Sequence, residues 1–442
     1  MKKSIFKLFF LVTVIVLALC LSSCFALDSY LNSSYSTDDL GHDNIGDGLQ
    51  IKSIDINNSG EMIITYTNGS KQNLGCVVGK DGNVNVDIQG NSNDVSYAVA
   101  KGLRSAVSIQ CSHTVYNKYG IPSASSSAGS GIIYKIDKET NSAFVITNFH
   151  VVYNENSSSN DGIAKEINVF LYGSEYADMS IPATYVGGSN NYDIAVLRID
   201  NCDALKSGVV LGATFADSDK TYAGQSAIAI GNPDGAGISA SYGIVSVYSE
   251  HITLNIGGSV SLRVMRIDTP VNSGNSGGGL YNENGELIGI VNAKTSDDSL
   301  ENIGYAIPSN IVKAVADNII DHCYGTELNR VQRALLNITV GISDSSAYLT
   351  EDGHVMVKET VFVSEVNRGG IAYGKLKKND ILISAKLNDT EIKITQQHQI
   401  IDFLLNARVG DTLYVTVERE TNTGIETVTA EIPITQDAIN EY

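Results

Sequence analysis

Short apolar segments, each ended by glycine, asparagine or aspartate, follow one another from about Val107 to Pro308. The chain has 41 glycines and only 6 prolines in 442 residues, which favours turn-rich β structure over a helical bundle. Short strands at this spacing are typical of an antiparallel barrel or sandwich of roughly 200 residues. The segments interpreted as strands are SGIIYKI, SAFVITN, INVFLY, DIAVLRI, QSAIAIG, GIVSVYS, LRVMRID and ELIGIVNA.

Helical patterns flank this β-rich region. Residues 96–107 read as a helix before it, and residues 310–325 carry apolar side chains at helical spacing after it, with Gly325 as a stop. The remainder, about 335–435, alternates strands with one helical segment at 395–407. At roughly 150 residues per domain, a chain of this length predicts two or three domains.

The N-terminus has the layout of a secretory signal. Lys2, Lys3 and Lys7 precede an apolar run from Leu8 to Leu21. That run is short for a membrane span, which needs about 20 apolar residues. It ends in the tetrapeptide LSSC, which resembles the lipobox of bacterial lipoproteins and implies cleavage after residue 23 and acylation of Cys24. A plain signal peptide and an uncleaved anchor are the alternatives.

The next segments carry no recognisable chemistry. Residues 24–48 are rich in Ser, Asn, Asp and Gly and read as a disordered tether. Residues 49–94 alternate short apolar runs with N-G and D-G turns, which predicts a small β module. The formal net charge of −19 argues against nucleic acid as a partner, because phosphate binding needs a basic face.

Four cysteines remain beyond the signal region, namely Cys76, Cys111, Cys202 and Cys323. They show no C-x-x-C spacing and no clustering with histidine, so we expect no metal site. An exported protein can pair four cysteines in three ways. Disulfides and buried free thiols therefore both stay open.

Residues 272–279 read NSGNSGGG, with Ser276 among six neighbours that are glycine or asparagine. Glycine lets the backbone turn its amide N–H groups toward a substrate carbonyl while a serine hydroxyl is presented. That geometry suits an acyl-transfer nucleophile. The same composition is also common in ordinary turns and linkers.

A serine nucleophile needs a base within hydrogen-bond reach and a carboxylate that orients the base. His150 closes the segment SAFVITNFHVV, which reads as a strand, and Asp193 opens the apolar strand DIAVL. Each alone has a structural explanation, as a satisfied histidine or a turn cap. The order His150, Asp193, Ser276 matches the chymotrypsin arrangement and differs from those of subtilisin and the α/β-hydrolases.

Several segments match one family in order. TNFHVV, DIAVL and GNSGG resemble the three signature blocks of the HtrA/Deg branch of trypsin-like serine proteases. The strings GSG at 129–131, AIGNP at 229–233, GIVS at 243–246 and IGYAIP at 303–308 resemble its further blocks. One departure is Gly279, where proline often follows GNSGG. The resemblance runs from Gly129 to Asn310.

The resemblance implies a role for each matched residue. Ser276 attacks the scissile carbonyl, His150 transfers the proton, and Asp193 fixes the imidazole tautomer. The backbone N–H groups of Gly274 and Ser276 form the oxyanion hole, and no metal or organic cofactor is required. Pro270 stands six residues before the serine, where trypsin has an acid, so a preference for Lys or Arg is not expected.

Ile303 and Tyr305 line the substrate pocket if the family pattern holds, which would favour small or medium apolar side chains. Both are equally explained as core strand residues. The C-terminal region resembles a PDZ domain through GGIA at 369–372, LKKNDI at 376–381 and VGD at 409–411. PDZ domains bind an extended peptide and its terminal carboxylate.

Val340, Gly341 and Ile342 are the candidate carboxylate loop of that domain. Two departures weaken the likeness. Thr339-Val340 replaces the usual aromatic or leucine pair, and Asn379 replaces a glycine.

The sequence thus predicts a mainly β protein, in which a chymotrypsin-like double β-barrel protease domain is followed by a PDZ-like α+β domain and preceded by a small β module. The expected division is 1–23 lipoprotein signal peptide, 24–48 tether, 49–94 β module, 95–310 trypsin-like protease domain, 311–334 linker helix and 335–437 PDZ-like domain.

The function expected from these assignments is a membrane-tethered extracytoplasmic serine endopeptidase that degrades unfolded or damaged exported proteins. The family resemblance further implies a homotrimer. The alternatives are a regulatory protease that cleaves one envelope partner and a non-proteolytic PDZ scaffold or chaperone.

Overall fold

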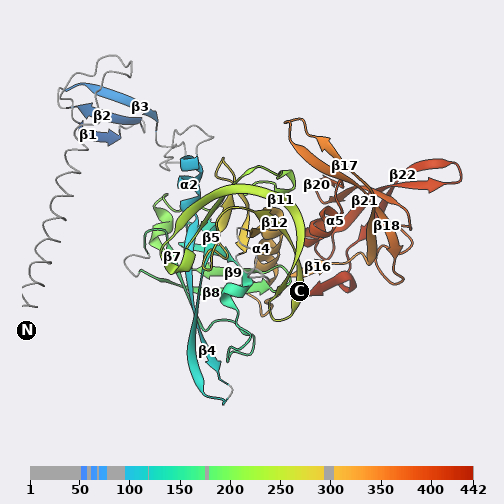
Figure 1. Ribbon diagram of the computed structural model, residues 1–442, viewed down its shortest axis with the longest axis horizontal. Coiled ribbons are helices and arrows are strands. Elements are labelled where there is room, and N and C mark those ends of the chain that lie inside the picture. The colour runs from blue at the N-terminus through green and yellow to red at the C-terminus, as the bar shows by residue number, and fades with distance from the viewer. Residues whose placement is uncertain are drawn as a thin grey trace, which may run out of the picture. The chain divides into compact units, whose positions relative to one another are not determined.

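The computed structural model confirms a mainly β protein (Figure 1). The chain divides into two compact units, Met1–Val86 and Asp87–Tyr442. The predicted signal peptide, the tether and Cys24 lie outside the described residues. No helix among the residues described is long and apolar enough to cross a membrane. The described residues are 51–56, 61–66, 69–76, 95–117, 119–174, 179–292 and 303–441.

The first unit contains a three-stranded antiparallel sheet with β2 at its centre. The third strand begins at Lys71. The strands are β1 (Ile51–Ile56), β2 (Glu61–Tyr66) and β3 (Lys71–Cys76).

The second unit begins with helix α2 (Val95–Leu103), which leads into a closed six-stranded antiparallel barrel. Around this first barrel the strand order is β4-β5-β6-β9-β8-β7. Inward side chains such as Val107, Ile109 and Leu197 are fully buried and fill it. Its strands are β4 (Ala106–Tyr116), β5 (Pro122–Asp137), β6 (Ser142–Thr147), β7 (Glu166–Leu171), β8 (Ile181–Ser189) and β9 (Ile194–Ile199).

A second closed barrel follows, with strand order β10-β11-β12-β15-β14-β13. The expected double barrel is therefore confirmed. Short 3₁₀ turns at Asp203–Lys206, Ser218–Lys220 and Pro233–Gly235 lie in the connections. The strands of this barrel are β10 (Ser226–Gly231), β11 (Ser239–Asn255), β12 (Ser259–Ile267), β13 (Gly279–Tyr281), β14 (Leu287–Asn292) and β15 (Gly304–Pro308).

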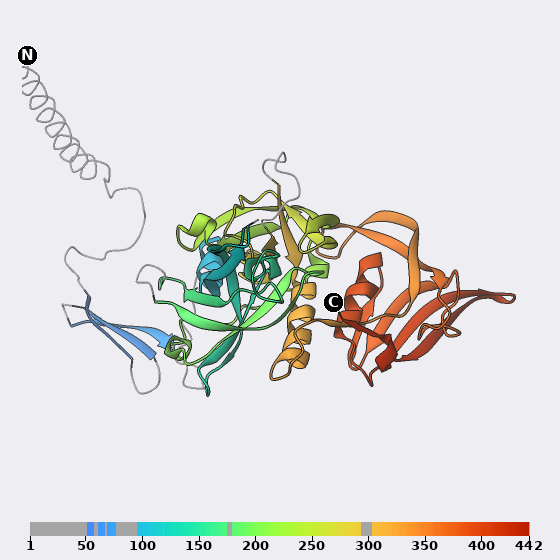
Figure 2. The ribbon, with the colours of Figure 1, turned by 90° about the horizontal axis from the view of Figure 1, so that it is seen from below.

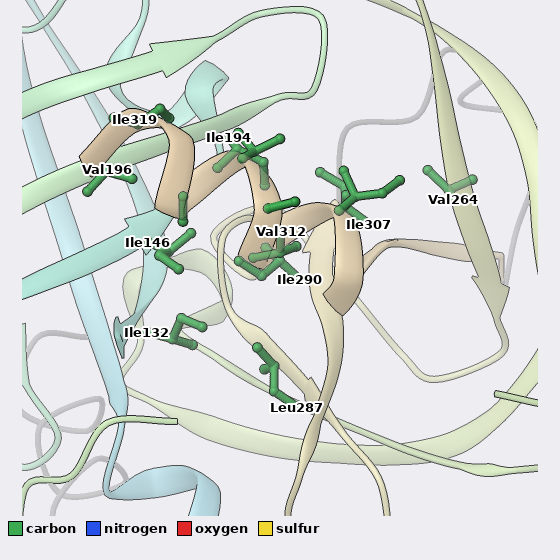
Figure 3. Packing of buried hydrophobic residues seen from close by; sticks show 14 of the residues in the cluster. Ile132, Ile146, Ile194, Val196, Val264, Leu287, Ile290, Ile307, Val312 and Ile319 are labelled. Atoms are coloured by element: carbon green, nitrogen blue, oxygen red, sulfur yellow. The ribbon is translucent and has the colours of Figure 1, made fainter. Parts of the chain in front are cut away.

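Helix α4 (Ser309–Cys323) joins the two barrels into one core. Figure 3 shows its Val312 and Ile319 among side chains of both barrels. Because α4 contacts β8 and β9 of the first barrel and β14 and β15 of the second, its apolar face holds the barrels together. The labelled partners are Ile132, Ile146, Ile194 and Val196 from the first barrel and Val264, Leu287, Ile290 and Ile307 from the second.

The C-terminal sheet, drawn in orange and red in Figure 2, has the strand order β17-β18-β19-β21-β22, with β20 paired to β19. Helix α5 (Gln397–Phe403) and a 3₁₀ turn at Leu404–Asn406 cover its apolar core. A separate pair, β16 and β23, connects the beginning and the end of this region. The strands are β16 (Gln332–Ala334), β17 (Ile338–Leu349), β18 (Val355–Val366), β19 (Ile381–Leu387), β20 (Thr390–Lys393), β21 (Thr412–Thr421), β22 (Gly424–Pro433) and β23 (Ile439–Glu441).

The predicted carboxylate loop is a strand. Val340, Gly341 and Ile342 lie within β17 and pair with Val363, Phe362 and Val361 of β18. A Cβ on Gly341 would stand 3.0 Å from the Phe362 ring, so this glycine makes room for an aromatic ring against the backbone rather than for a turn. The assignment of these three residues to a loop was wrong, and their binding role stays a prediction.

Candidate active site

The structure brings His150 and Asp193 into direct contact. The Nδ1 atom of His150 lies 2.7 Å from Oδ2 of Asp193, and the backbone N–H of His150 donates to Oδ1 at 2.9 Å. The Asp193 side chain is fully buried, whereas 14% of the His150 side chain is exposed. A buried carboxylate accepts hydrogen bonds, so this contact requires the ring proton on Nδ1 and leaves Nε2 as the acceptor.

His150 does not lie on a strand, contrary to the sequence interpretation. Strand β6 ends at Thr147, and Phe149–Val152 form a single helical turn, α3. At the end of the strand the Thr147 hydroxyl donates to the Ser130 carbonyl at 2.7 Å, and the pairing with β9 stops at the same residue. The helical turn brings the backbone N–H of His150 onto the carboxylate of Asp193.

Two asparagines that the sequence did not single out hold Asp193. Asn292, at the end of β14, donates from Nδ2 to Oδ2 of Asp193 at 2.8 Å. Asn148 donates from Nδ2 to the Asp193 backbone carbonyl at 2.8 Å. Both asparagines are fully buried. Asn148 lies inside the TNFHVV string, so its position beside the histidine was the only sequence signal for either residue.

Asp193 itself adopts a left-handed backbone conformation, with φ of 50°. Aspartate tolerates this region better than most residues, but surrounding contacts must stabilise it. The Asp193 N–H donates to the Asn190 carbonyl at 3.3 Å, which closes the turn between β8 and β9. The contacts of Asn148 and His150 hold the same turn from the side of the histidine.

Ser276 lies in the loop between β12 and β13 and is only 6% exposed. Its carbonyl accepts from the Ser130 N–H at 2.8 Å, so the loop is tied to the first barrel. Gly277 has φ of 86°, and a Cβ there would collide with the Ser130 carbonyl oxygen. Only glycine fits this position next to the serine.

Two carbonyls of this loop accept hydrogen bonds from backbone N–H groups. The Ser273 carbonyl accepts from the Asp234 N–H at 2.8 Å, and the Asn275 carbonyl accepts from the Gly278 N–H at 2.9 Å. In a trans peptide the N–H points opposite to the C=O. The N–H groups of Gly274 and Ser276, which belong to these two peptides, are therefore turned away from Asp234 and Gly278.

The residues predicted to line a substrate pocket lie at the start of β15. Tyr305 pairs with Asn292 on one side and with Arg266 on the other. Both Ile303 and Tyr305 are half-buried. Burial, together with the negative charge of Glu250, raises the pKa of the Tyr305 hydroxyl. Tyr305 thus neighbours the asparagine that binds Asp193, while a pocket-lining role for either residue stays a prediction.

Three cysteines of the second unit, Cys111, Cys202 and Cys323, are free thiols, and all three are buried. Of the two possibilities left open by the sequence, the structure has free thiols at these positions. Burial raises the pKa of Cys111 to about 12 and that of Cys323 to about 11. Within the described part of the chain, no three His, Cys, Asp or Glu residues are grouped to hold a metal ion.

Comparison with known proteins places this site in a family. Residues 129–290 match the family described as "Trypsin-like peptidase domain". A serine protease Do-like HtrA from Lactococcus lactis subsp. cremoris is 33% identical over 371 residues, which cover 77% of this chain and 83% of that protein. The chain belongs to the HtrA family of serine proteases.

Other relatives of this HtrA-family chain match over shorter lengths. A serine protease Do-like HtrA from Bacillus subtilis is 33% identical over 66% of the chain and 61% of the relative's length. The periplasmic pH-dependent serine endoprotease DegQ of Escherichia coli is 35% identical over 58% of the chain and 50% of DegQ. Among solved structures, the HtrA-type protease AlgW with decapeptide is 24% identical, covers 77% of this chain and 98% of AlgW, and has a TM-score of 0.47.

Proposed function

We propose that this HtrA-family chain is a serine endopeptidase that hydrolyses peptide bonds through Ser276, His150 and Asp193. The observation that carries the proposal is the pair of hydrogen bonds between a fully buried Asp193 carboxylate and His150. They hold the imidazole in the tautomer that can accept a proton at Nε2.

The proposed reaction has two halves. Ser276 Oγ attacks the scissile carbonyl carbon while its proton passes to His150 Nε2, and the same proton then goes to the leaving amine as the C–N bond breaks. Water next gives a proton to His150 Nε2 and its oxygen to the acyl carbon; the bond between that carbon and Ser276 Oγ then breaks, and His150 returns the proton to Oγ, which releases the product and restores the serine. Asp193 stays ionised throughout and stabilises the positive imidazole.

The backbone N–H groups of Gly274 and Ser276 are the proposed oxyanion hole. The orientation of their peptides supports this role, because both carbonyls are bound on the opposite side. Ser130 adds to the support by donating from Oγ to the Gly274 carbonyl at 2.7 Å. Each oxyanion donor is worth about 3 kcal/mol in the transition state. A loop held before substrate arrives loses little of that energy to reorganisation.

The substrates we propose are unfolded or damaged exported proteins, whose extended apolar segments suit a pocket formed by Ile303 and Tyr305. The protein would be held at the outer face of a membrane by a lipid on Cys24, as its LSSC sequence suggests. The C-terminal region would act as a PDZ-like domain that binds peptide at β17, and the protein would assemble as a homotrimer. These finer assignments rest on the family resemblance.

The test uses the full chain, purified in detergent, beside its Ser276→Ala variant. Both are incubated with β-casein, an unfolded polypeptide, and with a folded globular protein of similar size. We expect the wild-type chain to cleave casein selectively and the variant to lose at least about 10³-fold in rate. Equal cleavage by both proteins would exclude Ser276 as the nucleophile. Casein binding without cleavage by either would favour the scaffold alternative.

A further inference from the structure

The turn that carries Asp193 has a second support, besides its contacts with Asn148 and His150. It is formed by residues 329–334, which connect α4 to the C-terminal sheet and which we call the strap. The Gly188 N–H of β8 donates to the Asn329 carbonyl at 3.0 Å, and Gly188 and Arg330 form a parallel bridge. The strap therefore continues the sheet at β8, just before the turn.

The approach of the strap to β8 is close. A Cβ added to Gly187 would stand 2.9 Å from Ile319 Cγ2, 3.1 Å from Cys323 Sγ and 3.2 Å from the Asn329 carbonyl oxygen. A larger residue at this position would push both α4 and the strap away. Glycine at 187 thus makes room for a tight contact between the strap and the strand that leads to Asp193.

The strap also reaches the turn itself through a side chain. Arg333 donates from a guanidinium N–H to the Tyr192 hydroxyl at 2.7 Å. Tyr192 is the residue directly before Asp193, and its ring packs against the core shared by the two barrels. A charged donor makes a stronger hydrogen bond than a neutral one, so the contact restrains the turn next to the carboxylate.

The backbone next to Arg333 is held by helix α4. Asn318 of α4 is fully buried, donates to the Gln332 carbonyl at 2.6 Å and accepts from the Gln332 N–H at 2.9 Å. The same side chain donates to the Leu405 carbonyl at 3.2 Å. Strand β16 pairs with β23 in the register Arg333↔Asn440. The end of the chain therefore helps to set where Arg333 lies.

We propose that Arg333 and Tyr192 are positioning residues for the catalytic aspartate. Their hydrogen bond restrains the turn at the residue directly before Asp193, so that the carboxylate stays aligned with His150. The inference rests on the proposed function, because the alignment of Asp193 with His150 affects catalysis only if this pair acts on Ser276. It assigns the strap, and through it the last strand, a role in the chemical step.

The test compares Tyr192→Phe and Arg333→Met with the wild-type full chain, purified in detergent. Tyr192→Phe keeps the ring and its packing and removes only the hydroxyl. Arg408→Met is the matched control, because Arg408 of the same C-terminal region bonds Asp321 of α4 at 3.1 Å without touching the turn. The readouts are kcat and KM on a quenched fluorescent peptide with valine at the cleaved bond, and the rate of Ser276 labelling by a fluorophosphonate.

We expect both variants to lower kcat and the labelling rate about 3- to 10-fold, with KM within about twofold of wild type, since small misplacements of a catalytic group reduce turnover rather than binding. Arg333→Lys, which keeps a charged donor, should recover part of the loss, and Arg408→Met should keep the wild-type kcat. A purely structural role would lower melting temperature in all variants alike and leave the labelling rate unchanged.

Wild-type kcat in Tyr192→Phe, or an equal loss in Arg408→Met, would overturn the inference. If Arg333→Met does not fold, Tyr192→Phe decides alone. Failure of the proposed function would look different. The wild-type chain would then cleave no peptide and take up no label, or Ser276→Ala would cleave as well as wild type.

Discussion

A substitution of Asn292 tests most directly what keeps the buried Asp193 carboxylate in position. The carboxylate of Asp193 accepts three hydrogen bonds, two from His150 and one from Asn292 Nδ2 at 2.8 Å. Asn292→Ala removes the only one of these three that does not come from the histidine. The carboxylate then stays buried with one oxygen held by the imidazole alone, and it can rotate away from Nδ1.

The expected size follows from the charge of the acceptor. A hydrogen bond to an ionised group contributes about 1.5–3 kcal/mol. If the loss were expressed fully in the transition state, kcat would fall about 10- to 150-fold, because about 1.4 kcal/mol corresponds to a factor of ten. We expect the lower end, about tenfold, because a water molecule can take the place of the missing amide. A loss of about 1.5 kcal/mol would lower the melting temperature by about 3 to 6 °C.

The assay measures kcat on a quenched peptide and the melting temperature in the same preparations. The matched control is Asn282→Ala, which removes a buried asparagine of the same barrel that bonds Glu286 at 3.0 Å and does not touch Asp193. It should lower the melting temperature at least as much while kcat stays within about twofold of wild type. The reasoning would be refuted if the two variants lost stability equally and kcat was unchanged in both.

Two further outcomes are expected. Gly274→Ala should lower kcat by at least about 100-fold, because a Cβ there would collide with the Asn232 carbonyl oxygen and displace the proposed oxyanion donor. Gly224 has the same φ near +92° but open space around it, so Gly224→Ala controls for backbone strain alone. Equal losses of kcat in the two variants would contradict the oxyanion role. Cys111 and Cys323 should resist iodoacetamide at pH 8 until the protein is unfolded, because burial raises their thiol pKa values to about 12 and about 11. Since these pKa values are raised in the folded state, the two thiols contribute their full share of the folding stability below about pH 8.5 and lose it as pH rises toward the folded-state values. Rapid labelling of the native protein by iodoacetamide would argue against their burial.

The barrel strands show which parts of the fold the hydrophobic periodicity of the sequence predicts. DIAVLRI and QSAIAIG were recognisable as strands and became β9 and β10, because alternating or continuous apolar runs bounded by glycine and asparagine leave few other folds. The end of β6 was not recognisable. SAFVITNFHVV reads as one apolar strand, and the break after Thr147 depends on partners on β5 and β9 that are distant in sequence.

The C-terminal region shows the same limit. A glycine between Val340 and Ile342 suggested a loop, but the neighbouring ring of Phe362, some twenty residues away, explains why this position is a glycine. The two asparagines that bind Asp193 also left no distinct pattern, since buried asparagines and turn asparagines look alike in a sequence.

The sequence by itself predicted the β class, many of the barrel strands and the three candidate residues His150, Asp193 and Ser276, because local chemistry and their order along the chain carry that information. Only the tertiary structure decided how they are held. The helical turn under His150, the Asn292 bond to Asp193 and the strap behind Tyr192 each join segments far apart in the chain. The free energy of such contacts depends on distances between elements, and no local pattern encodes those distances.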